Sequence, residues 1–504
     1  MARHGSRGNA AGLSKTRLLN WLQCPKRLWL DVNLQDKPPP DAGTELVFRQ
    51  GHEVGAAAQA RFVNGQLIGS QHDLGTALTQ TREALRGRVR QPLFEAAFER
   101  DGLLIRADVL EPVRGGAWSL HEVKSTTSVK DCHHADVAVQ RWVLQASGLK
   151  LADHGLMHLD SSWTYRIDGD YAGLFAREDL SAETAALHRE VEQWVAGARQ
   201  TLASDEPDIA MGGQCTDPYP CPYQNHCARQ AGETEYPVMI LPGRAGKALA
   251  RRLAEQGYRD LRAVPAALIT DPASVLVHRV TGSGRRFLDR SAAAAIDWLP
   301  WPRAYLDFET MNFAVPRWAG TRPYQQVPFQ WSCHIETAPG RVEHAGFLDV
   351  DGVDPRRRCA EQLVSTLRGV KVILVYSAAF ERGRMQELAE SFPDLTGPLH
   401  EAIERIFDLL PLVRQCYYHR DMRGSYSLKA VLPTVLKADP YAALEAVRDG
   451  AGAQLAYLEA TNPATTVARR SALAEKLRAY CRVDSWAMIA VVRFLEGRPL
   501  PAMP

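Results

Sequence analysis

A chain of 504 residues is too long for one hydrophobic core and predicts two to four domains. The 60 Lys and Arg residues nearly balance the 58 Asp and Glu residues, so the net charge of +2 excludes a globally basic surface, and any nucleic-acid groove has to be local. No apolar run approaches the ~18 residues of a membrane span, and residues 1–12 lack the apolar stretch of a secretory signal. We therefore expect a cytoplasmic protein without a membrane partner, a flexible tail over residues 1–12, and nine cysteines that favour metal binding over disulfides.

The first predicted helix begins after Ser14, whose side chain is a favourable N-cap, and ends at Cys24-Pro25. A cysteine in such a position is usually a small, buried apolar residue. Residues 48–54, which include His52, lead into a second, alanine-rich helix. This histidine is either a metal ligand or a residue that packs against or caps the helix.

Two short strands then flank a turn at Gly115 and Gly116. Glu122 and Lys124 stand two residues apart, so they share one face of the second strand, and Asp108 on the first strand can reach that face. An Asp, a Glu and a Lys that converge suit a divalent ion held by carboxylates, with the ammonium beside the attacked phosphate. A surface salt bridge across the hairpin is the alternative interpretation of this D…ExK pattern.

Residues 136–144 are predicted to form an amphipathic helix that Gly148 ends. Successive turns of one face carry Asp136, Gln140 and Leu144. The short apolar run 156–159 is predicted to be a strand, and residues 181–203 a long helix capped by Ser181.

Three cysteines, Cys215, Cys221 and Cys227, follow with two gaps of five residues. Zinc sites prefer gaps of two to four, whereas iron–sulfur clusters accept wider and irregular sets of thiolates. The set needs a fourth ligand, and Cys24 is the only cysteine before the hairpin. We expect an iron–sulfur cluster that joins the first helix to the end of this domain, with zinc as the alternative.

The predicted domain 13–231 resembles the RecB-like nucleases, in particular the four-cysteine CRISPR-associated RecB-type exonuclease and the AddB nuclease domain. The resemblance rests on Cys24, His52, Asp108, Glu122-Val123-Lys124 and the cysteine trio. It implies a PD-(D/E)xK fold, one or two Mg²⁺ or Mn²⁺ ions and a [4Fe–4S] cluster. By this resemblance Asp108 and Glu122 bind metal, His52 adds a ligand, and Lys124 positions the water and steadies the transition state.

Two features depart from the pattern of that family. Its Gln-x-x-x-Tyr pair is here Gln140 and Leu144, which removes a phenol that contacts DNA, while Asp136 and Gln140 are expected to support the site. Its usual C-x2-C-x5-C spacing is here C-x5-C-x5-C.

Residues 232–298 are predicted to form a helical connector. A helix that begins near Gly243 and ends at Gly257 carries Arg251 and Arg252, and a second helix spans about 270–280. The glycine-containing turns suggest a helix-hairpin-helix that binds phosphates through backbone amides. A plain linker with a basic face is the alternative, because short glycine turns are common.

A second predicted chemical centre lies on the strand 304–310, where Asp307 and Glu309 project to one face. Two adjacent carboxylates repel one another unless a cation lies between them, so this pair favours metal binding. Further motifs follow in the order Ser377-x-x-Phe380-Glu381, Asp408-Leu409-Leu410, Ser427-Leu428-Lys429 and Tyr480-x-x-x-Asp484. We expect Ser377 to cap a helix, and Tyr480 and Asp484 to share one helix face.

This ordered set over residues 299–504 resembles the DnaQ-like exonucleases of the RNase H fold, in their tyrosine-type DEDD branch. The resemblance implies two Mg²⁺ ions held by Asp307, Glu309, Glu381 and Asp484, with Tyr480 orienting the water for 3′-to-5′ removal of nucleotides. Asp408 then supports the sheet.

Ser377 and Glu381 depart from the N-x-x-F-D motif of that family, which puts the rate and the metal preference of this site in question. The segment 316–326 mixes arginines with aromatic residues, and Arg322 and Tyr324 are candidates to stack unpaired bases beside the exonuclease site. A buried β-arch is the alternative.

The expected architecture is thus an α/β multidomain protein: a PD-(D/E)xK domain with an iron–sulfur cluster, a helical connector, and an RNase H-like domain. This tandem itself resembles a family of prokaryotic proteins. We expect a Mg²⁺- or Mn²⁺-dependent nuclease with two sites that cuts DNA single strands or ends. A nucleic-acid-binding scaffold with vestigial sites and an RNA-directed nuclease are the alternatives, and roles in repair, CRISPR adaptation and phage defence are all compatible with it.

Overall fold

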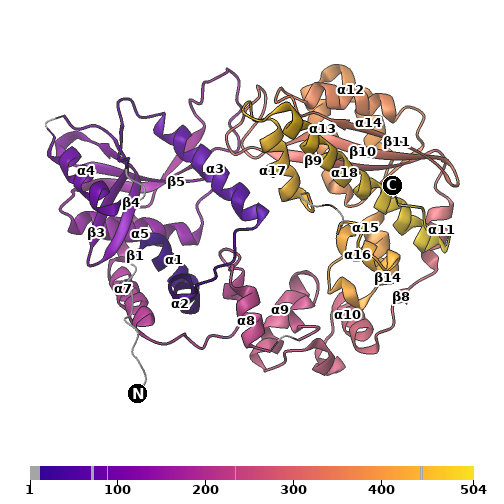
Figure 1. Cartoon of the computed structure of the whole chain (residues 1–504), viewed down its shortest axis with the longest axis horizontal. Coiled ribbons are helices and arrows are strands. Elements are labelled where there is room, and N and C mark those ends of the chain that lie inside the picture. The colour runs from indigo at the N-terminus through magenta and orange to yellow at the C-terminus, as the bar shows by residue number, and fades with distance from the viewer. Residues whose placement is uncertain are drawn as a thin grey trace. The chain divides into compact units, whose positions relative to one another are not determined.

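The computed structural model describes residues 12–69, 73–87, 89–232, 234–442, 444 and 447–503, so almost all of the predicted tail lies outside the described residues. The protein is a mixed α/β chain with several sheets (Figure 1). It divides into two compact units, Met1–Glu233 with Phe313–Tyr324, and Thr234–Asn312 with Gln325–Pro504. The predicted connector therefore lies within the second unit. None of the described helices is both long and apolar enough to cross a membrane.

The first unit is built on a sheet with the strand order β2-β3-β4-β5-β6-β7, and β1 pairs with β4. The strands are β1 Leu13–Ser14, β2 Gln66–Leu67, β3 Leu93–Arg100, β4 Leu103–Pro112, β5 Trp118–Lys124, β6 Leu151–Leu159 and β7 Phe175–Asp179. The β4–β5 hairpin turns at Gly115 and Gly116, which both have positive φ, as the glycine pair predicted. The strand predicted at 156–159 is the end of the longer β6.

Helices cover both faces of this sheet (Figure 1). The helices of this unit are α1 Lys15–Gln23, α2 Pro25–Asn33, α3 Ala42–Gln59, α4 Leu74–Arg86, α5 Asp131–Ala146, α6 Ser181–Ala186, α7 His188–Ala203 and α8 Gln224–Gln230. On one face, Val139 and Val143 of α5 pack with β-strand residues such as Leu120 in the main core. On the other face, Val54 and Ala58 of α3 pack with Met157. The sheet therefore presents Glu122, two residues after Leu120, towards α5.

Two local predictions for this unit are tested by the helix ends. Ser14 caps α1 as expected, because its side chain accepts a hydrogen bond from the backbone N–H of Arg17. The prediction of one continuous helix over residues 181–203 is wrong, because the helix is interrupted at Leu187 and forms α6 and α7. Ser181 is the first residue of α6 and not its cap; its hydroxyl donates to Asp179 at 2.5 Å.

The second unit holds a sheet with the order β11-β10-β9-β12-β13 and a small β14-β8 pair. The strands are β8 Phe287–Leu288, β9 Arg303–Asn312, β10 Gln326–Ala338, β11 Arg341–Leu348, β12 Val372–Val375, β13 Ile406–Asp408 and β14 Tyr417–Tyr418. The central strand β9 pairs antiparallel with β10 and parallel with β12. Leu306 and Phe308 point from β9 into the core formed with α12 and α13, so Asp307 and Glu309 face the opposite side.

The helices of this unit are α9 Gly243–Glu255, α10 Pro272–Ser283, α11 Ser291–Asp297, α12 Arg356–Thr366, α13 Ala378–Ser391, α14 Thr396–Glu404, α15 Leu409–Cys416, α16 Leu428–Leu436, α17 Gly450–Ala460 and α18 Val467–Glu496. The long helix α18 packs on the acidic face of β9 and β10 and ends at Gly497, whose φ of 71° is typical of a glycine C-cap. The predicted connector helices correspond to α9 and α10.

Candidate active sites and the cysteine cavity

The first candidate site lies where the β4–β5 hairpin meets α5. Glu122 on β5 is 1% exposed, and its Oε2 accepts a hydrogen bond of 2.5 Å from Nε2 of Gln140. Asp108 on β4 accepts the backbone N–H of Val123 at 2.8 Å, which holds its carboxylate beside β5. The structure thus brings together the predicted Asp108, Glu122 and Gln140.

Two lysines and two acids form a closed ring of ion pairs in this site, which we call the charge ring. The ammonium of Lys124 lies 2.6 Å from Glu122 and 2.6 Å from Asp136. The ammonium of Lys15, at the start of α1, lies 2.7 Å from the same Glu122 oxygen and 2.8 Å from Asp136. Lys15 was not among the predicted site residues, because nothing in its local pattern distinguishes it from a solvent-exposed first-turn lysine.

The electrostatics of the site follow from this ring. Burial, and then the negative charge of Glu122, raise the pKa of Asp108 well above its usual value. Burial alone would also raise the pKa of Asp136, but the charges of Lys124 and Lys15 hold it far below its usual range. Burial opposes the charged forms of both lysines, yet their acidic partners raise the pKa values of Lys15 and Lys124. Lys15, Lys124 and Asp136 are therefore ionised at neutral pH.

Other predicted residues lie at the margin of this site. His52 is on an exposed position of α3, close enough to Glu95 to lower the pKa of that carboxyl, which burial raises overall. Leu144 is fully buried in the core behind the site. The phenol of Tyr219, in the cysteine loop, lies 3.7 Å from Sγ of Cys132, and its pKa is raised to about 12 by burial and that thiol. The charge of Lys124 lowers the pKa of Tyr219, and the charge of Asp136 raises it. Tyr219 was not among the predicted site residues.

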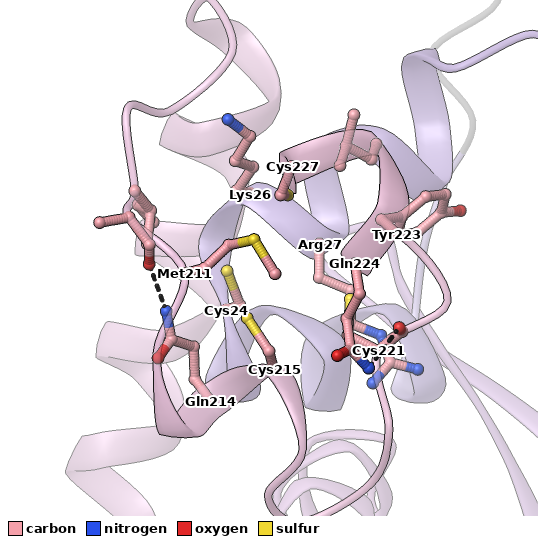
Figure 2. Close-up of a pocket in the computed structure, with 13 residues that line it drawn as sticks. Cys24, Lys26, Arg27, Met211, Gln214, Cys215, Cys221, Tyr223, Gln224 and Cys227 are labelled. Atoms are coloured by element: carbon pink, nitrogen blue, oxygen red, sulfur yellow. Dashed lines mark hydrogen bonds between the residues drawn. The ribbon is translucent and has the colours of Figure 1, made fainter. Parts of the chain in front are cut away.

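The four predicted cysteines face one cavity at the far end of α1 (Figure 2). Cys24 stands between α1 and α2, Cys227 is in α8, and Cys215 and Cys221 are in the loop before α8. The amide of Gln23 donates hydrogen bonds of 2.7 Å to the carbonyls of Gln214 and Tyr219, which ties this loop to α1. Burial raises the pKa values of the Cys221 and Cys227 thiols.

The spacing of these thiols bears on which metal centre they suit. Within the part of the chain that the structure describes, no three of the four sulfur atoms lie within 4.8 Å of one another. A tetrahedral zinc ion with Zn–S bonds of ~2.3 Å would hold its sulfurs roughly 3.8 Å apart. In any three of these described thiols, at least one pair is therefore farther apart than the ligands of one zinc ion.

The second candidate site is the acidic face of β9 beneath α18. Ligand atoms of Asp307, Glu309 and Cys481 lie within 4.8 Å of one another, the one such group found among the described residues. Sγ of Cys481 lies 3.7 Å from Oδ2 of Asp307. Glu381, on the first turn of α13, is 2% exposed, and its buried Oε2 has no hydrogen-bond partner among the described residues.

Burial and mutual repulsion shape the titration of these acids. Burial, and then the charges of Asp484, Glu309 and Glu381, raise the pKa of Asp307 well above its usual value. Burial and Asp484 raise the pKa of Glu309 to about 8, and burial raises that of Glu381 to about 8. Asp484 also has a raised pKa, caused by burial. Such a set of unpaired acids, with one orphaned oxygen, fits a divalent cation that would compensate their charge.

Two tyrosines and a lysine complete this site. Tyr441 donates a 2.5 Å hydrogen bond to Asp484, and the ammonium of Lys429 donates one of 2.6 Å to the hydroxyl of Tyr480. The ammonium also lies 4.6 Å from the centre of the Tyr480 ring. Tyr480 and Asp484 share one face of α18, as their spacing predicted. Lys429 was part of a predicted motif without a role, and Tyr441 was not predicted.

The start of α13 differs from the expectation for Ser377. Ser377 occupies the N-cap position, but its side chain makes no capping hydrogen bond and its φ is 90°. The carboxylate of Asp408 instead accepts the backbone N–H groups of Ser377 and Ala378, each at 3.0 Å. Asp408 also accepts the N–H of Leu410 at 3.0 Å, so it joins the ends of β12 and β13 to two helices. The prediction that Ser377 caps α13 is therefore wrong. Asp408 does lie in a supporting position, because it holds the ends of β12 and β13.

The predicted base-stacking segment belongs to the first unit. Tyr324 donates a 2.7 Å hydrogen bond to the carbonyl of Ser125, one residue after Lys124, and burial raises its pKa. Arg322 is exposed in the same segment.

Comparison with known proteins adds one finding. A family model described as a domain of unknown function, DUF2779, matches residues 304–427. The match spans β9 to the residue before α16 and includes Asp307, Glu309, Glu381 and Asp408, but not Lys429, Tyr480 or Asp484. No curated protein matches the chain.

Proposed function

We propose that this protein is a Mg²⁺- or Mn²⁺-dependent nuclease with two active sites, which hydrolyses phosphodiester bonds in DNA single strands or ends. The observation that carries the proposal is the gathering of Asp307, Glu309, Glu381 and Asp484, from three distant parts of the chain, in one buried place. Burying several carboxylates together is unfavourable unless cations compensate them. The ammonium of Lys429 supplies at most one of the charges required.

The strand orders support the folds proposed for the two units. In the second unit, β11, β10 and β9 pair antiparallel in that order. On the other side of β9, β12 pairs parallel with β9, and β13 pairs parallel with β12. This order, with acids on the central strand, supports an RNase H-like exonuclease domain of the DnaQ type. In the first unit, the acidic β4–β5 hairpin covered by α5 supports a PD-(D/E)xK domain.

At the second site, the residues of the chain have distinct roles in this proposal. Asp307, Glu309, Glu381 and Asp484 would hold the divalent ions, which when bound supply a nucleophilic water and neutralise charge on the phosphate. Tyr480 orients that water, and Lys429 fixes the phenol by donating to its oxygen. With its oxygen held by Lys429, the phenol would keep one orientation beside the acids and could help to position that water. We propose 3′-to-5′ removal of nucleotides at this site.

At the first site, Asp108 and Glu122 would hold the ion, and Lys124 would stabilise the charge that develops on the phosphate. The donor set fits, because Asp108 is half-buried beside β5, and Oε1 of Gln140 is buried without a hydrogen-bond partner among the described residues. The four cysteines would hold a [4Fe–4S] cluster that stabilises this unit.

The test separates the two sites with single conservative changes. Anaerobically purified protein is incubated with labelled single-stranded and duplex DNA and RNA in Mg²⁺ or Mn²⁺, with Glu122→Gln and Asp307→Asn each removing one site. We expect each variant to retain part of the cleavage pattern and the double variant to lose cleavage by at least about a hundredfold. Glu343→Gln, on the exposed edge of β11, is the matched control. Cleavage that survives in the double variant would contradict the proposal, and RNA cleavage alone would reassign the substrate.

A nucleic-acid-binding scaffold is the second candidate function. It is favoured by the charge ring, which already satisfies Glu122 and Asp136 with two ammonium groups. Tight binding of single strands without any metal-dependent cleavage by the unmodified chain would select this function over the nuclease.

A further inference from the structure

Lys15 lies between two carboxylates of the first site. Its ammonium lies 2.7 Å from Oε1 of Glu122 and 2.8 Å from Oδ1 of Asp136, so it bridges two carboxylates as a cation does. Lys124 contacts the same Oε1 of Glu122 at 2.6 Å. An ion that binds this oxygen has to compete with two ammonium groups, whereas Asp108 has no ammonium within ion-pair distance among the described residues.

The position of Lys15 is imposed by the fold. Ser14 caps α1, and the β1–β4 pairing of Leu13 with Leu103 holds the chain immediately before it. The side chain of Lys15 is only 15% exposed, and Glu122 and Asp136 are 1% and 4% exposed. A surface lysine can move away into water at little cost, but an ammonium buried between two carboxylates leaves only if another cation replaces it.

We propose that Lys15 couples metal binding to substrate binding at the first site. In the absence of substrate, its ammonium neutralises Glu122 and keeps the affinity for a divalent ion low. When a phosphodiester enters, the ammonium pairs with the phosphate, and Glu122 is released to bind the ion. This inference rests on the proposed nuclease function and adds a positioning residue to it.

Electrostatics set the size of the effect. Removing one positive charge about 5 Å from a divalent ion tightens ion binding by about tenfold even at the dielectric constant of water, and by more in a buried site. Reciprocity then requires that DNA tighten metal binding by the same factor by which metal tightens DNA binding. A coupling of about 5- to 150-fold is typical of linked sites.

The experiment measures binding of Mn²⁺ alone, by electron paramagnetic resonance and calorimetry, to the full chain. Asp307→Asn and Glu309→Gln are present throughout, so that bound Mn²⁺ reports on the first site. Each protein is titrated with and without short single-stranded phosphorothioate DNA, which resists hydrolysis. In this background we expect DNA to tighten Mn²⁺ binding at least about fivefold.

Lys15→Met is the decisive variant. We expect it to bind Mn²⁺ about tenfold more tightly than its parent without DNA, and to show a DNA effect of less than about twofold. Lys15→Arg keeps the charge and should retain the coupling, and Arg17→Gln removes a charge from the same helix outside the ring as a matched control. Should Lys15→Met not fold, as judged by circular dichroism, Lys15→Gln takes its place as the neutral variant.

The outcomes separate this inference from the proposed function. Unchanged or weaker Mn²⁺ binding in the neutral variants, while the parent binds Mn²⁺ and cleaves DNA at this site, overturns the role of Lys15 and leaves the nuclease intact. A parent that neither binds Mn²⁺ at this site nor cleaves DNA overturns both.

Discussion

The burial of Glu309 and Glu381 determines how the stability of the second site depends on pH. Both carboxyls have pKa values raised to about 8, mainly by burial. In the unfolded chain a glutamate has a pKa near 4.5. Between these values the folded protein, but not the unfolded one, keeps these two protons. The stability that the two carboxyls contribute is therefore greatest below pH 4.5 and is lost as the pH rises through 8.

This linkage leads to a prediction for the metal-free protein. Unfolding of the second unit should move to lower temperature between pH 6 and pH 8.5 in metal-free buffer, a loss on the order of 2–5 kcal/mol at about 1.4 kcal/mol per pKa unit. Mg²⁺ should raise the melting temperature more at pH 8.5 than at pH 6, because metal binding displaces protons. Differential scanning calorimetry measures both effects. Asp307→Asn with Glu309→Gln should flatten both, and a metal effect that is equal at the two pH values would contradict proton displacement from these buried acids.

Lys429 is the residue whose role at the second site the sequence motif left open. Its ammonium holds the Tyr480 hydroxyl at 2.6 Å and is also held by the carbonyl of Arg448 at 3.0 Å. Lys429→Met should lower kcat of the second site by about tenfold or more, since the phenol loses its fixed orientation, while metal binding stays within about threefold. Single-turnover cleavage in a Glu122→Gln background measures this. Lys437→Met, exposed at the end of α16, is the control. A change in KM alone would point to substrate binding instead.

At the scale of elements, α1 joins the two chemical parts of the first unit. Lys15 at its first residue enters the charge ring, and Gln23 at its last residue holds the cysteine loop, next to Cys24. The same loop carries Tyr219 to within 3.7 Å of Cys132, at the start of α5. A nine-residue helix and one loop thus connect the cysteine cavity with the first candidate site.

This connection predicts a selective effect of losing the cluster. Cys227→Ser should remove the absorption near ~400 nm expected of a bound cluster. It should also lower cleavage at the first site by at least about tenfold, because the end of α1 next to Cys24 loses an anchor and Lys15 lies on the same helix. Cleavage at the second site, measured in a Glu122→Gln background, should stay within about twofold. Cys416→Ser, near Ser291 in the second unit, is the control. An equal loss at both sites would show that the effect is general unfolding.

At the scale of the whole molecule, the first unit is completed by a segment from far along the chain. Ala314 and Val315 pack with Val54 and Ala58 of α3, and the backbone of Tyr165 exchanges hydrogen bonds with Thr321 and Gly320 at 2.9 and 2.7 Å. The unit is therefore not continuous in sequence, since it consists of Met1–Glu233 and Phe313–Tyr324.

A fragment that ends at residue 233 should accordingly be less stable than the same unit in the full chain. Without residues 313–324, apolar surface on α3 and β6 is exposed to water. Each Å² of exposed apolar surface lowers the free energy of unfolding by about 25 cal/mol. We expect a lower melting temperature, binding of a hydrophobic dye and early proteolysis after α3, and we expect a peptide of residues 313–324 to restore part of the stability. A fragment as stable as the unit in the intact chain would show that this segment contributes nothing to it.

The sequence alone determined which residues share an element and a face. Alternation on one strand placed Asp307 beside Glu309 and Glu122 beside Lys124, and capping chemistry placed the start of α1, because these patterns depend only on local geometry. The mixed α/β class was confirmed for the same reason. Only the tertiary structure decided that Lys15 enters the charge ring, that Asp408 caps α13 in place of Ser377, and that Tyr324 packs beside Ser125. Periodicity specifies the direction of a side chain on its own element. The partner that the side chain contacts depends on how distant elements pack, and the spacing of two residues along the chain does not tell how far apart they lie in the folded protein.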